Sequence, residues 1–381
     1  MSFLTAFLLC SLVPSAPSPP AEGTAEYYVA LPESVYCVEA ETGMELVSRN
    51  ADLRRPPASM IKMMMMLMVD EGVEAKKWSY DTIIPVSKNA EGMGGTQVYV
   101  KMGEKHPLES LMLAVAVASA NDASMAVAEG LWGGKAQYLE ACNRRAQELG
   151  MTQSSFHSVH GLPPSKGESF DLTTARDMAI LGRACVRRPK ILEWTSRKEL
   201  VFRESDGVKA STNKLLGVVP GCDGIKTGFI RAAGFCITAT AARDGVRVIA
   251  VVMGDTKRGR FESAGEVLEQ GLGMVTRVRP VTAGMTVGRA VPVTNGIAPT
   301  VSLTARDALE TVVRKEDAGK LQLMVSAPAA LAAPVAAGAE AGGVKLMLGD
   351  RVLGETALVT ASGTEAKTLW RRMMDKTGMG R

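Results

Sequence analysis

The stretch that decides the fold of this chain is Ala58-Ser59-Met60-Ile61-Lys62, which leads into an almost wholly apolar run over 63–69. Two prolines come directly before it. They end any preceding regular structure and place Ser59 at the cap or first turn of a new helix. Because the run that follows is nearly all apolar, we expect the helix over 60–69 to be buried in the core. On that helix Ser59 and Lys62 lie one turn apart on the same face.

A serine and a lysine in this spacing can perform nucleophilic chemistry without a histidine. A lysine amine that is kept neutral can take the proton of the serine hydroxyl, and the positive end of the helix favours the negative charge that develops. The chain has only 3 histidines, and no Gly-x-Ser-x-Gly sequence lies near His157 or His160. We therefore expect neither a histidine-based triad nor a metal site, and we interpret His160 as a structural loop residue.

Two further elements downstream carry compatible chemistry. Ser119-Ala120-Asn121 follows an apolar segment and offers a hydroxyl and an amide, and Lys226-Thr227-Gly228 offers a cation and a hydroxyl at a predicted strand start. Gly228 would let a substrate approach the strand closely. Similar short patterns recur at 211–214 and 376–378, but the sequence around them lacks the matching helix or strand. Only the set containing Ser59, Ser119 and Lys226 falls on a helix start, a helix end and a strand start.

The two lysines of this set need opposite protonation states. An apolar helix, a helix N-terminus and the nearby cation of Lys226 would all lower the pKa of Lys62, which must be neutral to act as a base. Lys226 is expected to stay charged, because its task would be to hold a carboxylate.

Predicted helices and strands continue up to about residue 273. Strands are expected over 34–39 and 44–48, and a core hairpin over 237–253 turns around Asp244-Gly245. Helices are expected over 108–118, 123–131, 135–149, 172–187 and 260–272. From 277 to 360, short Val-, Thr- and Leu-rich segments alternate with turn residues, which predicts a small all-β domain. The Ala-rich 329–341 region is expected to be a long loop or an expanded hairpin tip.

Composition limits the classes of protein to consider. The 381 residues are 46% hydrophobic and 22% charged, which is typical of a soluble globular protein and excludes a disordered, collagen-like or polytopic membrane chain. A net charge of +4 and 5% aromatic residues argue against nucleic-acid binding. The 6 cysteines include no Cys-x-x-Cys pair, so we expect buried thiols, with one disulfide as the alternative in an oxidising compartment.

Both ends of the chain resemble targeting segments. The apolar run over 3–13 is too short to span a bilayer, and with the small residues Gly23-Thr24-Ala25 it predicts a signal peptide over 1–25 and export. No Lys or Arg precedes Arg49, so a cytoplasmic chain with an apolar tail is the alternative, as is a lipidated Cys10. Over 365–381, apolar residues fall on one helical face and basic residues on the other. This pattern indicates either an interfacial membrane helix or a helix docked on the protein.

Taken together, the motifs resemble those of the low-molecular-mass penicillin-binding D-alanyl-D-alanine carboxypeptidases, which are relatives of the serine β-lactamases. The resemblance includes the three motifs and continues through Asn121-Asp122-Ala123, His160-Gly161-Leu162, the 174–179 segment and the block from Gly221 to Phe229. It is strong over 27–275. The β-rich 277–360 region is similar to the C-terminal β-domain of the family, and the terminal helix is similar to its membrane anchor.

This resemblance implies an α+β architecture. A β-lactamase-like (transpeptidase-like) catalytic domain over 26–276, with helices flanking an antiparallel sheet, would be followed by a β-rich domain over 277–364. An amphipathic membrane-associating helix would occupy 365–381. The protein would then be exported and lie outside the cytoplasm, peripheral on the outer face of the cytoplasmic membrane.

The resemblance also implies residue roles. Ser59 would be the nucleophile, Lys62 its general base, and Ser119 and Asn121 would line the cleft and assist proton transfer and substrate placement. On the predicted strand, Lys226 and Thr227 would bind the terminal carboxylate of the peptide, and Gly228 would admit the substrate. The main-chain amides of Ser59 and Phe229 would form the oxyanion hole.

The implied reaction is acylation of Ser59 by a D-Ala-D-Ala stem peptide of peptidoglycan, loss of D-Ala, and hydrolysis of the acyl-enzyme, with no cofactor and no nucleic acid. β-Lactam antibiotics would be covalent inhibitors. A β-lactamase is the nearest rival, but the Glu-x-x-Leu-Asn signature is absent and the extra β-domain is foreign to that class. A D,D-endopeptidase would use the same residues. A non-catalytic wall-binding module would need neither Ser59 nor Lys62.

Overall fold

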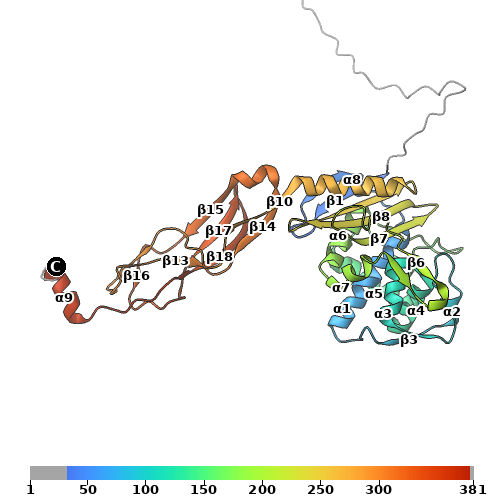
Figure 1. Cartoon of the computed structure of the whole chain (residues 1–381), viewed down its shortest axis with the longest axis horizontal. Helices are drawn as coiled ribbons and strands as arrows, with labels where there is room; N and C mark the ends of the chain where they lie inside the picture. Colours follow the sequence, from blue (N-terminus) through green and yellow to red (C-terminus); the bar gives the residue numbers. More distant parts are fainter. Residues whose placement is uncertain (1–31, 378–381) are drawn as a thin grey trace, which may run out of the picture.

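The computed structural model describes residues 32–377, so the predicted signal peptide over 1–25 lies outside the described residues. Figure 1 shows a domain of helices around a sheet, joined to a slender β-domain that leads to a short terminal helix. The expected α+β class, with an all-β region after the catalytic domain, is thereby confirmed.

The first domain is built on a five-stranded antiparallel sheet with the order β2-β1-β9-β8-β7. Its strands are β1 (Ser34–Glu39), β2 (Glu45–Arg49), β7 (Cys222–Ile230), β8 (Gly234–Arg243) and β9 (Val246–Asp255). β8 and β9 turn at Asp244-Gly245, where φ is +51° and +73°. Positive φ at both positions matches a two-residue hairpin turn to the strand twist, so the predicted hairpin is confirmed. β7 lies at the edge of the sheet.

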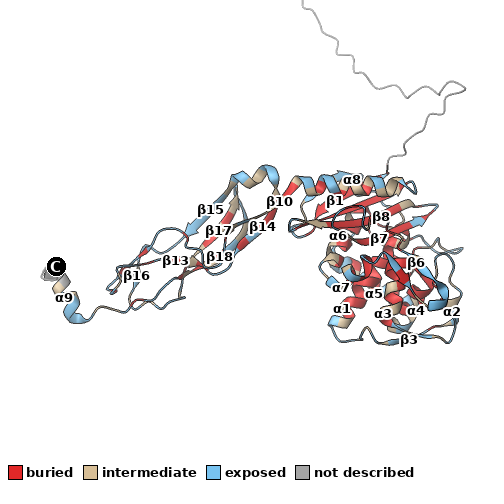
Figure 2. Cartoon of the chain, viewed as in Figure 1, coloured by how far each residue is buried: buried red, intermediate tan, exposed pale blue. Residues whose placement is uncertain are grey.

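Helices cover both faces of this sheet (Figure 2). Alternate residues of β9 show the division: Val248, Ala250 and Val252 pack with α8 (Gly259–Met274), whereas Ile249 and Val251 belong to the cluster around α1 (Lys62–Glu74) and α6 (Ala175–Val186). Successive strand side chains point to opposite faces, so the apolar run of β9 serves two cores at once.

Helix α1 runs through the middle of the larger core. Every side chain from Met63 to Val69 is buried, which confirms the expected core helix. The α-helix begins only at Lys62, because a 3-10 turn, η1 (Ala58–Ile61), precedes it. Ser59 therefore lies in this tight first turn, and its side chain makes no capping bond to the helix.

The remaining elements complete the first domain around α1. They are β3 (Ile83–Pro85), α2 (Lys88–Glu91), β4 (Lys105–Pro107), α3 (Leu108–Leu113), η2 (Ala114–Ala118), α4 (Asn121–Trp132), α5 (Lys135–Leu149), α7 (Pro189–Thr195), β5 (Glu199–Val201), η3 (Glu204–Asp206) and β6 (Val208–Ala210). The expected single helix over 108–118 is divided, because its last five residues form the π-helical segment η2. Such a wide turn often occurs at functional sites.

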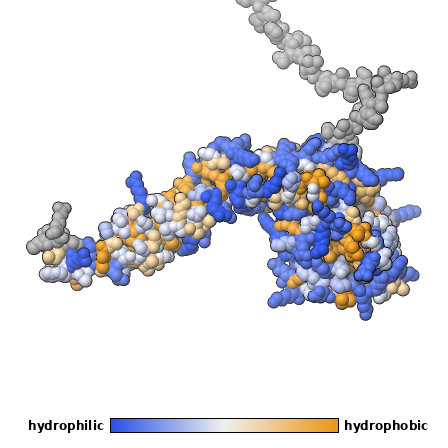
Figure 3. Space-filling model, viewed as in Figure 1, coloured by the Kyte–Doolittle hydropathy of each residue, from blue (hydrophilic) through white to orange (hydrophobic). Residues whose placement is uncertain are grey.

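The second domain consists of short strands around its own small core. Its elements are β10 (Val275–Val281), β11 (Val291–Thr294), β12 (Thr300–Val301), β13 (Leu303–Ala305), β14 (Leu309–Arg314), η4 (Lys315–Lys320), β15 (Leu321–Ser326), β16 (Leu331–Ala332), β17 (Glu340–Leu348) and β18 (Arg351–Thr360). At the junction, Arg277 donates to the carbonyl of Gly245 and Arg314 to that of Glu45. β15 is an edge strand with exposed apolar side chains, and Figure 3 shows apolar surface along this domain.

The described chain closes with α9 (Leu369–Thr377), at the end of the β-domain farthest from the first domain (Figure 1). Leu369, Trp370 and Met373 on this helix are exposed. Within residues 32–377, no helix has both the length and the apolar character needed to cross a membrane.

Candidate active site

The structure brings Ser59 and Lys62 together at the start of α1. The Lys62 amine lies 3.0 Å from the Ser59 hydroxyl, 2.7 Å from the Asn121 side-chain oxygen and 2.9 Å from the His160 carbonyl. A neutral amine has two N–H donors and one lone pair. If its two donors go to Asn121 and His160, the lone pair faces the hydroxyl proton of Ser59. This is the geometry that proton abstraction needs.

The surroundings of Lys62 favour the neutral amine. The side chain is completely buried, and burial lowers its pKa well below the ordinary value, with the nearby cation of Lys226 as the second cause. The charges of Asp122 and Asp171 act in the opposite direction but do not outweigh these effects. The expected lowering of the Lys62 pKa is therefore confirmed, with desolvation as its main cause.

Two glycines hold the main chain at Ser59 from opposite sides. Gly161 packs so closely that a Cβ on it would lie 2.1 Å from the Ala58 carbonyl oxygen. A Cβ on Gly228 of β7 would lie 2.7 Å from the Pro57 carbonyl oxygen and 3.2 Å from the Ser59 nitrogen. The peptide before Ser59 is thus enclosed between a loop and the edge strand. Ala58 has a φ of +49°, a strained conformation that persists only where its surroundings enforce it.

Ser119 and Asn121 lie where η2 ends and α4 begins. Ser119 has a φ of +62°, so the chain reverses there in a left-handed turn and enters α4 at Asn121. The Asn121 amide donates to the Gly94 carbonyl while its oxygen faces Lys62, which fixes the orientation of the amide. Ser119 is buried in the same region, although within residues 32–377 no hydrogen bond joins its hydroxyl to Ser59, Lys62 or Lys226.

Lys226 and Thr227 are buried on β7, and the Lys226 amine donates to the Thr227 carbonyl at 3.1 Å. Burial, and then the charge of Arg260, lower the pKa of Lys226 to about 7. Sequence reasoning predicts that Lys226 stays charged in order to hold a carboxylate, whereas at this pKa the unliganded amine is only partly charged near neutral pH. A carboxylate beside it would act in the opposite direction, because an opposite charge favours the charged form.

Phe229 is the exposed residue near the end of this strand, and Arg260 of α8 lies beside it. Phe229 is 51% exposed and stacks on Phe235 with the ring centres 4.0 Å apart. The Arg260 guanidinium lies over Phe235 and Phe261 and donates to the Gly228 carbonyl at 3.1 Å. Nothing in the local sequence pointed to Arg260, because α8 brings it to β7 from more than 30 residues downstream.

The His160 loop contributes a main-chain group that sequence reasoning missed. The His160 carbonyl accepts from Lys62 and lies 3.3 Å from the Ser59 hydroxyl, which can donate to it when its proton is not directed at the amine. Burial is the main cause that lowers the pKa of the imidazole to about 3, so the ring is neutral. The interpretation of His160 as a loop residue is correct for its ring, but its carbonyl belongs to the site.

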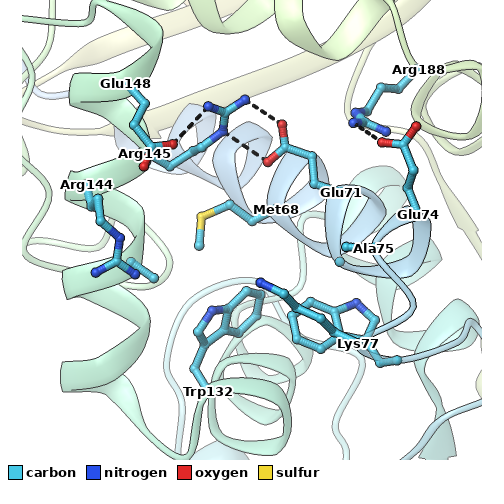
Figure 4. A pocket seen from close by; sticks show the side chains of 13 residues that line it. Met68, Glu71, Glu74, Ala75, Lys77, Trp132, Arg144, Arg145, Glu148 and Arg188 are labelled. Atoms are coloured by element: carbon cyan, nitrogen blue, oxygen red, sulfur yellow. Dashed lines mark hydrogen bonds and ion pairs between the residues drawn. The ribbon is translucent and has the colours of Figure 1, made fainter.

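Two cavities of the structure lie away from the side chains of Ser59 and Lys62. A groove of about 770 Å³ runs behind the His160 loop, between α2, α4 and the 162–169 segment. A second cavity, of about 400 Å³, lies at the far end of α1 (Figure 4), where Arg145 forms ion pairs with Glu71 and Glu148. Neither contains Ser59 or Lys62. Over the described range 32–377, His, Cys, Asp and Glu side chains form no group that could hold a metal ion.

Comparison with known proteins places this site in a family. Residues 24–257 match the model of the D-alanyl-D-alanine carboxypeptidase peptidases, and residues 276–366 match the C-terminal domain of penicillin-binding protein 5. D-alanyl-D-alanine carboxypeptidase DacF of Bacillus subtilis is 30% identical over 329 residues, which are 85% of this chain and 83% of the relative. DacD of Escherichia coli is 28% identical, over 95% and 92% of the two chains.

Solved structures agree with these matches. Penicillin-binding protein 6B from Escherichia coli superposes with a TM-score of 0.69 at 25% identity, covering 90% of this chain and 99% of that one. Penicillin-binding protein D2 from Listeria monocytogenes, solved in its ampicillin-bound form, has a TM-score of 0.58 at 30% identity, covering 65% and 100%.

The fold and the matches define a two-domain penicillin-binding serine peptidase. The chain belongs to the D-alanyl-D-alanine carboxypeptidase family, and its activity is the serine-type removal of the terminal D-alanine from peptidoglycan stem peptides. The main expectation from the sequence is thereby confirmed.

The contact between Gly161 and Ala58 generates a first prediction. Gly161→Ala places a methyl group against the Ala58 carbonyl, so we expect the rate of labelling by fluorescent penicillin to fall by about a hundred-fold through displacement of Ser59. Gly167→Ala is the matched control, since it has the same sign of φ (+90° against +82°) but open space around it. Both substitutions incur the left-handed penalty of about 1 kcal/mol. Equal labelling rates in the two variants would contradict the close-packing argument.

Proposed function

We propose that Ser59 attacks the carbonyl of the penultimate D-alanine while Lys62 takes the hydroxyl proton. The terminal D-alanine leaves with a proton returned from the site, and water then hydrolyses the ester on Ser59. The observation that carries this proposal is the buried Lys62 amine, 3.0 Å from the hydroxyl and surrounded by neutral oxygen acceptors. A neutral base and a hydroxyl in contact are the minimum that acyl transfer requires.

Substrate placement is proposed to use the β7 edge. Lys226 and Thr227 would hold the terminal carboxylate, and this carboxylate would in turn favour the charged form of Lys226. Gly228 lets the strand lie against the main chain of Ser59, which supports an oxyanion hole made by the amides of Ser59 and Phe229. Ser119 would pass a proton toward the departing amine, and Asn121 would orient both Lys62 and the substrate.

Labelling with fluorescent penicillin tests the choice of nucleophile. Ser59→Ala should abolish covalent labelling. Ser211→Ala is the matched control, because Ser211 also begins a Ser-x-x-Lys sequence, yet its hydroxyl accepts from the Asn213 main-chain amide and lies outside the proposed site. Labelling that survives Ser59→Ala and disappears in Ser211→Ala would show that the proposed constellation is wrong.

The base is tested by the pH dependence of acylation. Burial lowers the pKa of Lys62 and so favours the neutral amine, and the acylation rate should fall as pH drops through that pKa. Lys62→Arg cannot supply a neutral base, so we expect a loss of about 10²- to 10⁴-fold. Lys226→Arg keeps a cation and should retain partial activity. A near-normal acylation rate in Lys62→Arg, measured by stopped flow, would remove Lys62 from the base role.

We further propose that the protein is exported and bound to the outer face of the cytoplasmic membrane through α9, with the domain limits 26–276, 277–364 and 365–381. On α9, Leu369 is 79% exposed and Trp370 is 71% exposed, and cationic side chains accompany them. An amphipathic helix with a basic face and a tryptophan suits an anionic lipid surface. These exposed apolar side chains argue against a helix docked on the protein.

Truncation tests this attachment. Residues 365–367 pair with 295–297 through main-chain hydrogen bonds, so the cut should come after Thr368. Deletion of 369–381 should abolish binding to vesicles that contain anionic lipid and leave penicillin acylation unchanged. Trp370→Ala should weaken binding, because it removes the largest apolar side chain of the exposed face. Unchanged vesicle binding after the deletion would refute the anchor.

A further inference from the structure

A short segment, Asp171-Leu172-Thr173, forms main-chain hydrogen bonds both to the base of the His160 loop and to the chain that leads to Ser59. The main chains of Leu172 and Ser155 exchange two hydrogen bonds, of 2.8 and 2.9 Å, at the base of the loop that carries His160. The main chains of Thr173 and Arg55 exchange two more, of 2.7 and 2.9 Å, on the approach to Ser59. This segment therefore sets the distance between the nucleophile and the His160 loop.

The Asp171 side chain extends this attachment into the loop. Its carboxylate is buried and accepts from the His157 amide at 2.6 Å, the Ser158 amide at 2.8 Å and the Ser158 hydroxyl at 2.5 Å. The Ser158 hydroxyl in turn accepts from the Gly161 amide at 2.7 Å. One carboxylate thus fixes both ends of the turn that presents the His160 carbonyl.

We propose that Asp171 and Ser158 act as positioning residues for the Lys62 base, by holding the His160 carbonyl against its amine. The proposal rests on the proposed function, in which Lys62 removes the Ser59 proton. If the carbonyl moves, the amine loses one of two acceptors for its N–H groups, and its lone pair is no longer directed at Ser59. Positioning errors of about 1 Å can cost a hundred-fold in rate.

Asp171 also acts on Lys62 through its charge. The groups that influence the proton affinity of Lys62 are Lys226, which disfavours the ammonium, and Asp122 and Asp171, which favour it. The His160 ring is neutral. Removal of the Asp171 charge should therefore make Lys62 easier to deprotonate, whereas removal of the Ser158 hydroxyl changes geometry but leaves the charge in place. The two substitutions can be distinguished by their pH profiles.

The chain contains a matched control for this arrangement. Asp177, also buried, accepts from the Gln153 amide at 3.0 Å and from the Ser154 hydroxyl at 2.7 Å. This carboxylate-serine pair has the same chemistry as Asp171 and Ser158. The Ser154 hydroxyl also contacts the Thr173 hydroxyl at 2.7 Å, but the pair makes no hydrogen bond to residues 157–161 in the described structure. It should contribute to folding without acting on the base.

The experiment compares Asp171→Asn and Ser158→Ala with Asp177→Asn and Ser154→Ala in the full chain. Stopped-flow acylation by a penicillin is measured across pH, and thermal melting is recorded for each variant. We expect Ser158→Ala to slow acylation by about ten-fold. It should leave unchanged the acid limb of the profile, which is the pH range in which the acylation rate falls on the acid side. Asp171→Asn should slow acylation by ten- to a hundred-fold and shift the acid limb to lower pH. The control pair should change the melting temperature but not the limb.

Each result of this experiment supports or overturns the positioning role of Asp171 and Ser158. Acylation rates and pH profiles of Asp171→Asn and Ser158→Ala that match those of the control pair would overturn the proposal. If Asp171→Asn does not fold, the comparison of Ser158→Ala with Ser154→Ala still decides it. Failure of the base assignment itself would appear separately, as a Lys62→Arg enzyme that acylates at a normal rate, whatever the Asp171 variants do.

Discussion

The rest of the site depends on the burial of one amine. Lys62 is fully removed from solvent, yet it forms none of the ion pairs found in the described part of the chain. A buried ammonium without a carboxylate partner is strongly disfavoured, and the group responds by losing its proton. Its contacts are the neutral oxygens of Ser59, Asn121 and His160. On the proposal that Lys62 is the base, the fold favours its neutral form by burying the amine and giving it no ion-pair partner.

Several elements of the fold create the surroundings of Lys62 and Ser59. The apolar α1 helix excludes water behind Lys62, and the π-helical turn before Ser119 brings Asn121 to the amine from another direction. Gly161 and Gly228 allow the His160 loop and β7 to approach the Ser59 main chain from two sides. Because each contact needs a residue without a side chain or a turn with positive φ, the geometry is sensitive to substitutions that leave the chemical groups intact.

Sequence alone predicts those parts of the site that depend on side-chain type and local pattern. Ser59, Lys62 and Lys226 stand out because their spacing coincides with a helix start and a strand start, and the buried α1 follows from its unbroken apolar run. The His160 carbonyl could not be predicted, because every residue has such a carbonyl and only the tertiary fold selects one. Arg260 was missed for a similar reason, and the lowered pKa of Lys226 follows from a burial that its strand position does not reveal.

The two lysines of the cleft remain different even when a substrate carboxylate arrives. Such a carboxylate would stabilise the ammonium of Lys226. Its negative charge would also reduce the repulsion between Lys226 and a protonated Lys62. That change alone would raise the proton affinity of Lys62 and oppose catalysis. Burial, however, is the larger cause of the lowered Lys62 pKa, and Lys226 only the second. Lys62 is already fully buried without substrate, so this larger effect does not depend on the charge of Lys226. On the proposal that Lys62 is the base, burial therefore continues to favour its neutral amine when the substrate binds.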